Sequence, residues 1–214
     1  MAICFRPVTV IGSWTTTQLA QSTTCRVTAG GVYGVDWGDG TVESFVGNGV
    51  DQVRAHLYGA AGTYRQTWTI VNPALLQRFQ GQSNLWVGVV PSTRTFTALT
   101  IFYCYTNQLT GSIPSLTANT ALTIFYCYSN QLTGSTPSIL AATITTFNVS
   151  TNLLPLDQLK LILADFLVSA AGPGRPAVVT ISLGGTGNAA LDAAALATKA
   201  AIIALQPGWI ITNN

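Results

Sequence analysis

Two adjacent segments in the second half of the chain have almost the same sequence. Residues 101–123 read IFYCYTNQLTGSIPSLTANTALT, residues 124–146 read IFYCYSNQLTGSTPSILAATITT, and the two agree at 16 of 23 aligned positions. Less regular copies precede and follow them, and successive copies begin 23, 23 and 22 residues apart, at Phe79, Phe102, Phe125 and Phe147. A unit this short cannot bury its own apolar residues, so we expect the copies to stack and share one core.

The pattern within a copy indicates the kind of repeat. The first copy reads Leu99-x-x-Phe102-x-Cys104-x-x-Asn107-x-Leu109-x-Gly111-x-Ile113-Pro114. This pattern closely resembles the plant-type leucine-rich repeat, which ends in Leu-Thr-Gly-x-Ile-Pro, although cysteine replaces leucine at one strand position. The resemblance implies a solenoid of stacked coils with a parallel sheet along one side.

Side-chain alternation assigns the two faces of that sheet. Successive residues of a strand point to opposite faces, so the phenylalanine and cysteine of each copy should point into the core. Four tyrosines should then point outward: Tyr103, Tyr105, Tyr126 and Tyr128. We interpret the inward pair Cys104 and Cys127 as packing residues rather than as metal ligands or a disulfide.

An asparagine recurs at the same place in each copy. These residues are Asn84, Asn107, Asn130 and Asn152. Equivalent residues of stacked coils form rows, and each coil turns where its asparagine stands. We therefore expect a row of inward amides that bind the backbone groups left unpaired at these turns.

The outward face is the candidate contact surface. Its tyrosines should be flanked by amides and hydroxyls of the neighbouring copies, and the expected binding residues are Gln80, Gln82, Tyr103, Tyr105, Tyr126, Tyr128, Asn148 and Ser150. Tyrosine offers a large contact area at low entropic cost, which favours binding of a partner. The alternative is that the aromatic pairs only stabilise the sheet. A protein and a sugar are both compatible ligands.

The last 60 residues predict two helices and two strands. Leucines and a phenylalanine at helical spacing indicate a helix that begins with Pro155 as its first residue and stops at Gly172-Pro173-Gly174. A strand at 177–183 should follow, then a helix capped by Asn188 that continues to about Leu205, and a strand at 209–212. Residues 183–209 resemble the terminal cap of leucine-rich-repeat proteins from bacteria and their phages. Such a cap would close the exposed end of the solenoid core.

Residues 1–72 lack the repeat and predict a separate β-sandwich. Six β-prone runs are separated by Gly, Asn and Ser, at residues 8–11, 26–29, 32–37, 41–46, 52–58 and 64–71. The motifs Trp37-Gly38-Asp39-Gly40-Thr41, His56-x-Tyr58 and Gly62-Thr63-Tyr64 resemble the polycystic-kidney-disease-type (PKD) immunoglobulin-like domain. The resemblance implies that His56 makes a structural hydrogen bond beneath the turn. Asn72-Pro73 marks the boundary, so we expect a PKD-like sandwich at 1–72 and a capped solenoid at 73–214.

The sequence gives little support to catalysis or to a metal site. His56 is the only histidine, no nucleophile motif accompanies it, and Asp36 and Asp39 supply fewer oxygens than Ca²⁺ usually takes. No Cys-x-x-Cys pair is present, which argues against zinc. Cys4 and Cys25 fit either free thiols or a disulfide between neighbouring strands. We expect no enzyme activity, no cofactor and no metal.

Composition narrows the partners. Charged residues make up 7% of the chain and the net charge is +2, too little positive charge for nucleic acid or an anionic membrane, and no run of apolar residues is long enough for a membrane helix. No export signal is visible in the first residues, which fits a trimmed chain, an unusual export route or assembly inside a cell that later lyses, as virus particles do.

The combined features lead to one functional hypothesis and an alternative. The pairing of domains and the low charge resemble accessory proteins of bacteriophage particles. The hypothesis is a non-enzymatic virion surface protein, a head decoration or a fibre-type adhesin, which contacts other virion proteins and a host surface protein or glycan. The sandwich would anchor it, the tyrosine face would make the contact, and oligomers are compatible. The alternative is a secreted or cell-surface bacterial adhesin that binds protein or glycan.

Overall fold

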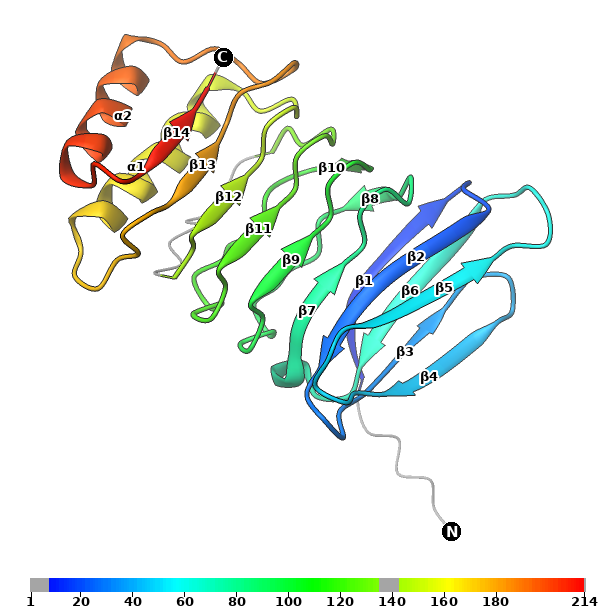
Figure 1. Ribbon diagram of the computed structural model, residues 1–214. Helices are drawn as coiled ribbons and strands as arrows, with labels where there is room; N and C mark the ends of the chain where they lie inside the picture. Colours follow the sequence, from blue (N-terminus) through cyan, green and yellow to red (C-terminus); the bar gives the residue numbers. More distant parts are fainter. Residues whose placement is uncertain (1–7, 135–142, 214) are drawn as a thin grey trace.

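The computed structural model describes residues 8–134 and 143–213. These residues are mainly β, in two mixed sheets, with two α-helices near the C-terminus. The six-stranded sheet has the order β10-β8-β1-β6-β3-β4, and the eight-stranded sheet has the order β14-β13-β12-β11-β9-β7-β2-β5. Figure 1 shows an antiparallel region at one end of the molecule, followed by a row of parallel strands and then the helices.

The antiparallel region contains the first six strands. They are β1 (Thr9–Thr16), β2 (Ala20–Val27), β3 (Val32–Asp36), β4 (Val42–Val46), β5 (Gln52–Leu57) and β6 (Tyr64–Ile70). Two predicted strands were misplaced, because β1 continues well beyond Ile11 and β2 begins six residues before Arg26. The inward positions of β2 include Gln21 and Thr23 as well as Cys25, so its hydrophobic alternation is hidden in the sequence.

The parallel region is built from equivalent positions of the repeats. Its strands are β7 (Leu76–Gln80), which follows a 3₁₀ turn at Pro73–Leu75, then β9 (Ile101–Tyr103), β11 (Ile124–Tyr126), β12 (Thr146–Asn148), β13 (Thr180–Ser182) and β14 (Ile210–Thr212). The lead phenylalanines are in register across four strands, and Ile181 and Ile211 continue the row. Two short strands, β8 (Val87–Val89) and β10 (Gln108–Thr110), pair on the opposite side of the coils.

Each coil turns through a strained residue that directly precedes its asparagine. The residues Ser83, Thr106, Ser129 and Thr151 have φ between 51° and 56°, in the left-handed region that few non-glycine residues adopt. The repetition of this conformation in four coils shows that it belongs to the turn itself. Its cost, about 1–2 kcal/mol per residue, is offset by the hydrogen bonds of the asparagine that follows.

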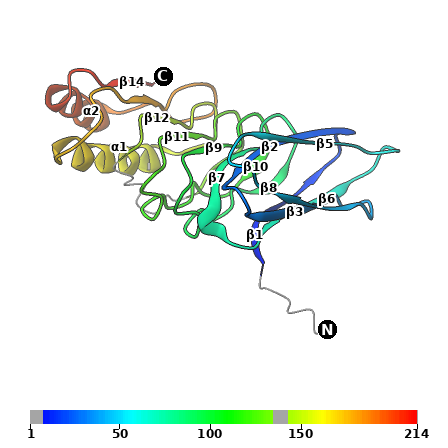
Figure 2. The same cartoon turned by 60° about the horizontal axis from the view of Figure 1, so that its bottom comes forward.

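Helices α1 (Leu156–Ala171) and α2 (Ala193–Leu205) close the C-terminal end, and Figure 2 shows them on the same side of the eight-stranded sheet as the six-stranded sheet. The helices occur where the sequence predicted them, but both starts differ. Pro155 is the N-cap of α1 rather than its first residue. Asp192 caps α2 by accepting a hydrogen bond from the Ala195 amide. None of the described helices is long and apolar enough to cross a membrane.

One core and both sheets continue across the expected boundary at Asn72-Pro73. Strand β2 of the antiparallel region pairs with β7, and β1 pairs with β8. Trp14 stacks on Trp86 with ring centroids 4.2 Å apart, and the buried apolar residues form one cluster from Ile11 to Ile211. The predicted domains at 1–72 and 73–214 therefore share a core, with β2 occupying the place of a preceding coil.

Candidate binding surface

The eight predicted binding residues lie together on the outer face of the eight-stranded sheet. We call this set the tyrosine face: Gln80, Gln82, Tyr103, Tyr105, Tyr126, Tyr128, Asn148 and Ser150. Parallel pairing places Gln80 beside Tyr103, Tyr103 beside Tyr126, and Tyr126 beside Asn148. Beyond the strands, backbone bonds from Ser83 to Tyr105 and from Thr106 to Tyr128 continue the alignment. All eight side chains are half-buried.

The tyrosine rings form two stacked pairs. Tyr103 and Tyr126 have centroids 4.8 Å apart and an interplanar angle of 10°, and Tyr105 and Tyr128 have centroids 4.4 Å apart and an angle of 8°. Within each repeat the two tyrosines are tilted or edge-on to one another. Each ring therefore gives one face to its stacking partner. The surface left to a ligand consists of ring edges, hydroxyls and the outer faces of the end rings.

The hydroxyls of Tyr103 and Tyr128 stay protonated. Partial burial raises the pKa of Tyr103 and of Tyr128 above the usual tyrosine value, and the neighbouring phenols raise both further. At neutral pH these groups are hydrogen-bond donors and acceptors without charge.

The charges nearest to the tyrosines stand at one end of the face. Asp51 accepts from Arg26 at 2.8 Å and forms a second ion pair with Arg78. The positive charge of Arg78 lowers the pKa of Tyr103, but burial of the phenol raises it by more. Sequence reasoning missed these groups, because Asp51 and Arg26 belong to the antiparallel region and reach the face only through the pairing of β2 with β7.

The polar residues at the two ends of the tyrosine face differ in whether their hydrogen-bonding groups already have partners. The Ser150 hydroxyl donates to Asn148 Oδ1 at 2.7 Å, so this end of the face is internally satisfied. At the other end, the amide oxygen of Gln82 is buried and has no hydrogen-bond partner among the described residues. A buried acceptor without a partner is costly, which makes the surroundings of Gln82 the part of the face with unused binding capacity.

A disulfide joins the two repeats beneath the tyrosines. Cys104 and Cys127 are bonded, their Cα atoms are 5.0 Å apart, and both are fully buried. The interpretation of these cysteines as packing residues was wrong. The signal was present in the sequence, since equivalent residues on adjacent parallel strands lie about 4.8 Å apart, within the Cα range of disulfides. Cys25 is a free thiol whose complete burial raises its pKa, and Cys4 lies outside the described residues.

The row of asparagines lies under the turns of the coils. Asn107 accepts from the backbone amides of Asn84 and Trp86 at 3.0 Å and donates to the carbonyls of Gly81 and Cys104. Asn130 and Asn152 repeat this arrangement one and two coils later.

The row has members at each end that differ from the rest. Asn84 binds the backbone of Ser22 in β2, where a preceding coil would stand. A fifth amide, Asn188, accepts from Leu154 and donates to Val149 and Leu183, so it continues the row and does not cap α2. The sequence did not predict Asn188 as a member of this row because its spacing differs. Asn188 follows Leu183 by five residues, whereas Asn107 follows Cys104, the equivalent residue of its own coil, by three.

The aspartate turn of the antiparallel region is a structural unit. His56 Nε2 lies 2.7 Å from Asp39 Oδ2, and the His56 ring stacks on Trp37. Asp39 also accepts from the Thr41 amide, and Asp36 accepts from the Gly38 amide. The hydrogen bond from Thr41 is the main cause that lowers the pKa of Asp39, and the bond to His56 adds to it. Among residues 8–134 and 143–213, no three His, Cys, Asp or Glu side chains gather as metal ligands would.

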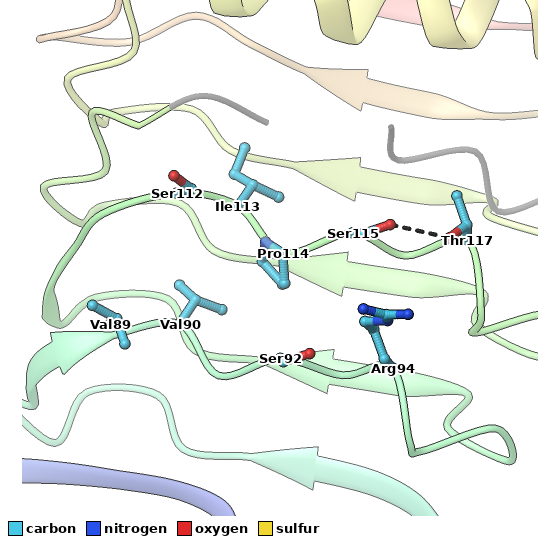
Figure 3. Close-up of a pocket in the computed structure, with 9 residues that line it drawn as sticks. All are labelled: Val89, Val90, Ser92, Arg94, Ser112, Ile113, Pro114, Ser115 and Thr117. Carbon is cyan, nitrogen blue, oxygen red and sulfur yellow. Dashed lines mark hydrogen bonds between the residues drawn. The ribbon is translucent and has the colours of Figure 1, made fainter. Parts of the chain in front are cut away.

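Among the described residues, two open hollows that adjoin the coils are of a size that could hold a small ligand. The larger, about 680 Å³, lies between the segments that follow β8 and β10, and Figure 3 shows Arg94 and several hydroxyls along it. The equivalent segment of the next repeat, residues 135–142, lies outside the described residues, and we assign no site there. The second hollow, about 500 Å³, adjoins the tyrosine face and is lined by Tyr105, Gln82 and residues of β2.

Comparison with protein-family models, with curated proteins and with solved structures finds no match for this chain. Its function is therefore inferred from its own geometry.

Proposed function

We propose that this chain is a non-enzymatic adhesion protein on the surface of a virus particle, and that it contacts its partner through the tyrosine face. In this proposal the antiparallel region is a PKD-type sandwich that anchors or spaces, and the parallel region is a leucine-rich-repeat solenoid. The recurring pattern around Asn107 and the in-register strands support the solenoid, and the hydrogen bond between His56 and Asp39 at the turn supports the sandwich. The contacted partners would be other virion proteins and a host surface protein or glycan.

The observation that carries the proposal is the presence of two stacked pairs of tyrosines on an outer sheet face. Each tyrosine remains partly accessible, although aromatic residues that serve packing alone are usually more deeply buried. Stacking already fixes the ring orientations, so little conformational entropy remains to be lost when a partner binds. Neutral hydroxyls along the ring edges would supply hydrogen bonds without the desolvation cost of charged groups.

The alternative, a secreted or cell-surface bacterial adhesin, is favoured by one observation. The Cys104–Cys127 disulfide is compatible with an extracellular location, because disulfides persist in the periplasm and outside the cell. Gold-labelled antibodies against this chain distinguish the two. Label on purified virus particles supports the virion, whereas label on intact uninfected cells supports the adhesin.

A binding experiment tests the contact surface itself. The labelled protein is titrated onto whole bacterial cells of the strain from which it is obtained, alongside Tyr103→Phe/Tyr126→Phe and Tyr103→Ser/Tyr126→Ser double variants. We expect the serine variant to lose at least tenfold in affinity, equivalent to about 1.4 kcal/mol. The phenylalanine variant should keep the ring stack and lose less affinity. The affinity that it does lose measures the contribution of the two hydroxyls to binding.

The matched control removes a stacked tyrosine elsewhere. Tyr64 stacks on Tyr58 in the antiparallel region with ring centroids 3.8 Å apart, so Tyr64→Ser removes a comparable aromatic pair far from the tyrosine face. Its affinity should equal that of the unmodified chain. Absence of binding to the cells, or equal loss in Tyr64→Ser and in the double serine variant, contradicts the proposal.

A further inference from the structure

The hollow beside the tyrosine face lies where the antiparallel region meets the first coil. Its volume is about 500 Å³, within the range of small-molecule sites in proteins. Eight side chains with polar groups or a ring line it: Gln18, Gln21, Ser22, Thr24, Gln82, Ser83, Asn84 and Tyr105. Strand β2 supplies Ser22 and Thr24, and the first coil supplies Gln82 and Ser83, so the site exists only because the two regions share a sheet.

Tyr105 contributes an open ring face to this hollow. Its stacking partner Tyr128 belongs to the next coil and covers one side of the ring. On the other side, the corresponding position of the preceding coil is held by Gln82, which lines the same hollow. Tyr105 is therefore the end ring of its stack, with one face directed toward an amide and a cavity.

The hydrogen-bonding groups around the hollow are neutral. Ser22, Thr24 and Ser83 contribute hydroxyls to its lining, and the buried amide oxygen of Gln82 has no hydrogen-bond partner within residues 8–134 and 143–213. No charged side chain lines the hollow, and Ala20 is its one aliphatic residue. A lining without charge does not favour an anionic ligand. It also lacks the apolar centre that a protein interface requires.

The floor of the hollow is rigid. Asn84 binds the Ser22 backbone through both ends of its amide, and Gln21 donates to the Asn84 carbonyl and accepts from the Trp86 indole. Both floor residues are buried with their hydrogen bonds made. A ligand would therefore meet a preformed surface, which lowers the entropic cost of binding.

We propose that this hollow binds an uncharged saccharide, with one sugar ring against the open face of Tyr105 and its hydroxyls on Gln82, Ser22 and Ser83. Only a polyhydroxylated, uncharged ligand uses the aromatic face and the neutral donors and acceptors together. This inference rests on the proposed adhesive function. It identifies the partner as a glycan rather than a protein, and it places the bound sugar against Tyr105, the end ring of the stack.

The test begins with an array of defined neutral oligosaccharides (gluco-, manno-, galacto- and chito-oligosaccharides) and acidic ones (sialylated and uronic-acid oligosaccharides). The strongest hit is then titrated by calorimetry into four variants: Tyr105→Ser, Tyr105→Phe, Gln82→Leu and Tyr64→Ser. We expect a neutral hit, a loss of at least tenfold in Tyr105→Ser and in Gln82→Leu, and nearly full affinity in Tyr105→Phe, which keeps the ring face. Tyr64→Ser is the matched control, because it removes a stacked tyrosine of the antiparallel region that neither lines the hollow nor belongs to the tyrosine face.

The outcomes separate this inference from the proposed function. No hit on the array, an exclusively acidic hit, or equal losses in Tyr105→Ser and Tyr64→Ser overturns the saccharide site. If cell binding nevertheless persists after periodate oxidation of the cell-surface glycans and still depends on Tyr103 and Tyr126, the partner is a protein and the adhesive function stands. If cell binding is also absent, both proposals fail.

Discussion

The antiparallel and parallel regions share a sheet and a core but are stabilised in different ways. In the antiparallel region each interior contact occurs once, as in the network that links Gln21, Gln66 and the Trp86 indole. In the parallel region the same contacts recur from coil to coil, as in the row of asparagines and the stacked phenylalanines. Because the coils repeat, one residue type at one position of the repeat forms a row along the surface. The tyrosine face arises in this way.

The largest expected effect comes from breaking the row of asparagines at its centre. Replacing Asn107 by Ala leaves the amides of Asn84 and Trp86 and the carbonyl of Gly81 without their partner, whereas the Cys104 carbonyl keeps its hydrogen bond from Asn130. An unsatisfied buried polar group costs about 1–3 kcal/mol, and some of these groups will recruit water, so we expect about 4 kcal/mol of stability to be lost. Urea unfolding of Asn107→Ala measures this loss.

Two further variants test whether this loss of stability depends on the position of the asparagine. Asn130→Ala should cost less than Asn107→Ala, because Asn130 accepts from one backbone amide rather than two. Asn148→Ala, on the outer face, should change stability by less than about 1 kcal/mol, since its side chain is only half-buried and accepts hydrogen bonds from Ser150, two residues along the chain. Equal losses in Asn107→Ala and Asn148→Ala would show that the amide row does not support the coils.

The second prediction concerns the disulfide, which has no counterpart in the described antiparallel region. Cys104 and Cys127 are separated by 23 residues, and closing a loop of that size stabilises the native state by about 3 kcal/mol in the chain-entropy model. A Cys104→Ala/Cys127→Ala double variant should lose that amount, and a reducing agent should then have no further effect on it. Denatured protein should show two more reactive thiols after reduction than before.

The control for this prediction lies in the other region. Cys25 is buried and unbonded, so Cys25→Ala should leave the response to reducing agent unchanged. If the thiol count does not rise on reduction, or if reduction alters the double variant as much as the unmodified chain, the disulfide is not a feature of the folded protein.

The same difference explains what the sequence could predict. Strand register, the inward asparagines and the outward tyrosines follow from the spacing of Phe79, Phe102, Phe125 and Phe147, because equivalent residues of stacked repeats must be neighbours. The pairing of β2 with β7 did not follow from any pattern, since it depends on a contact between regions without common periodicity. The hollow beside Tyr105 was therefore not predictable, although Gln82 and Tyr105 had both been assigned to the binding face.

The smallest expected effects are those of two aspartates, one in each region, that stabilise the fold as carboxylates. The Thr41 amide and then His56 lower the pKa of Asp39, and Lys160 and then the Ala195 amide lower the pKa of Asp192. A carboxyl group with a lowered folded-state pKa contributes stability above its unfolded pKa, and this contribution is lost as the pH falls through the folded value. Asp39→Asn and Asp192→Asn should therefore each lower the melting temperature at pH 7, and the difference from the unmodified chain should shrink as the pH is lowered from about 4.

Salt distinguishes the two aspartates, because their main partners differ. Lys160 forms an ion pair with Asp192 at 2.7 Å on the surface between the helices, and such exposed pairs are screened by salt. The main partner of Asp39 is a backbone amide within its own turn, two residues along the chain, where screening has less influence. In 0.5 M NaCl at pH 7 the effect of Asp192→Asn on the melting temperature should decrease, while that of Asp39→Asn should persist. Equal sensitivity to salt would mean that the pairing with His56, rather than the hydrogen bond from Thr41, governs the aspartate turn of the antiparallel region.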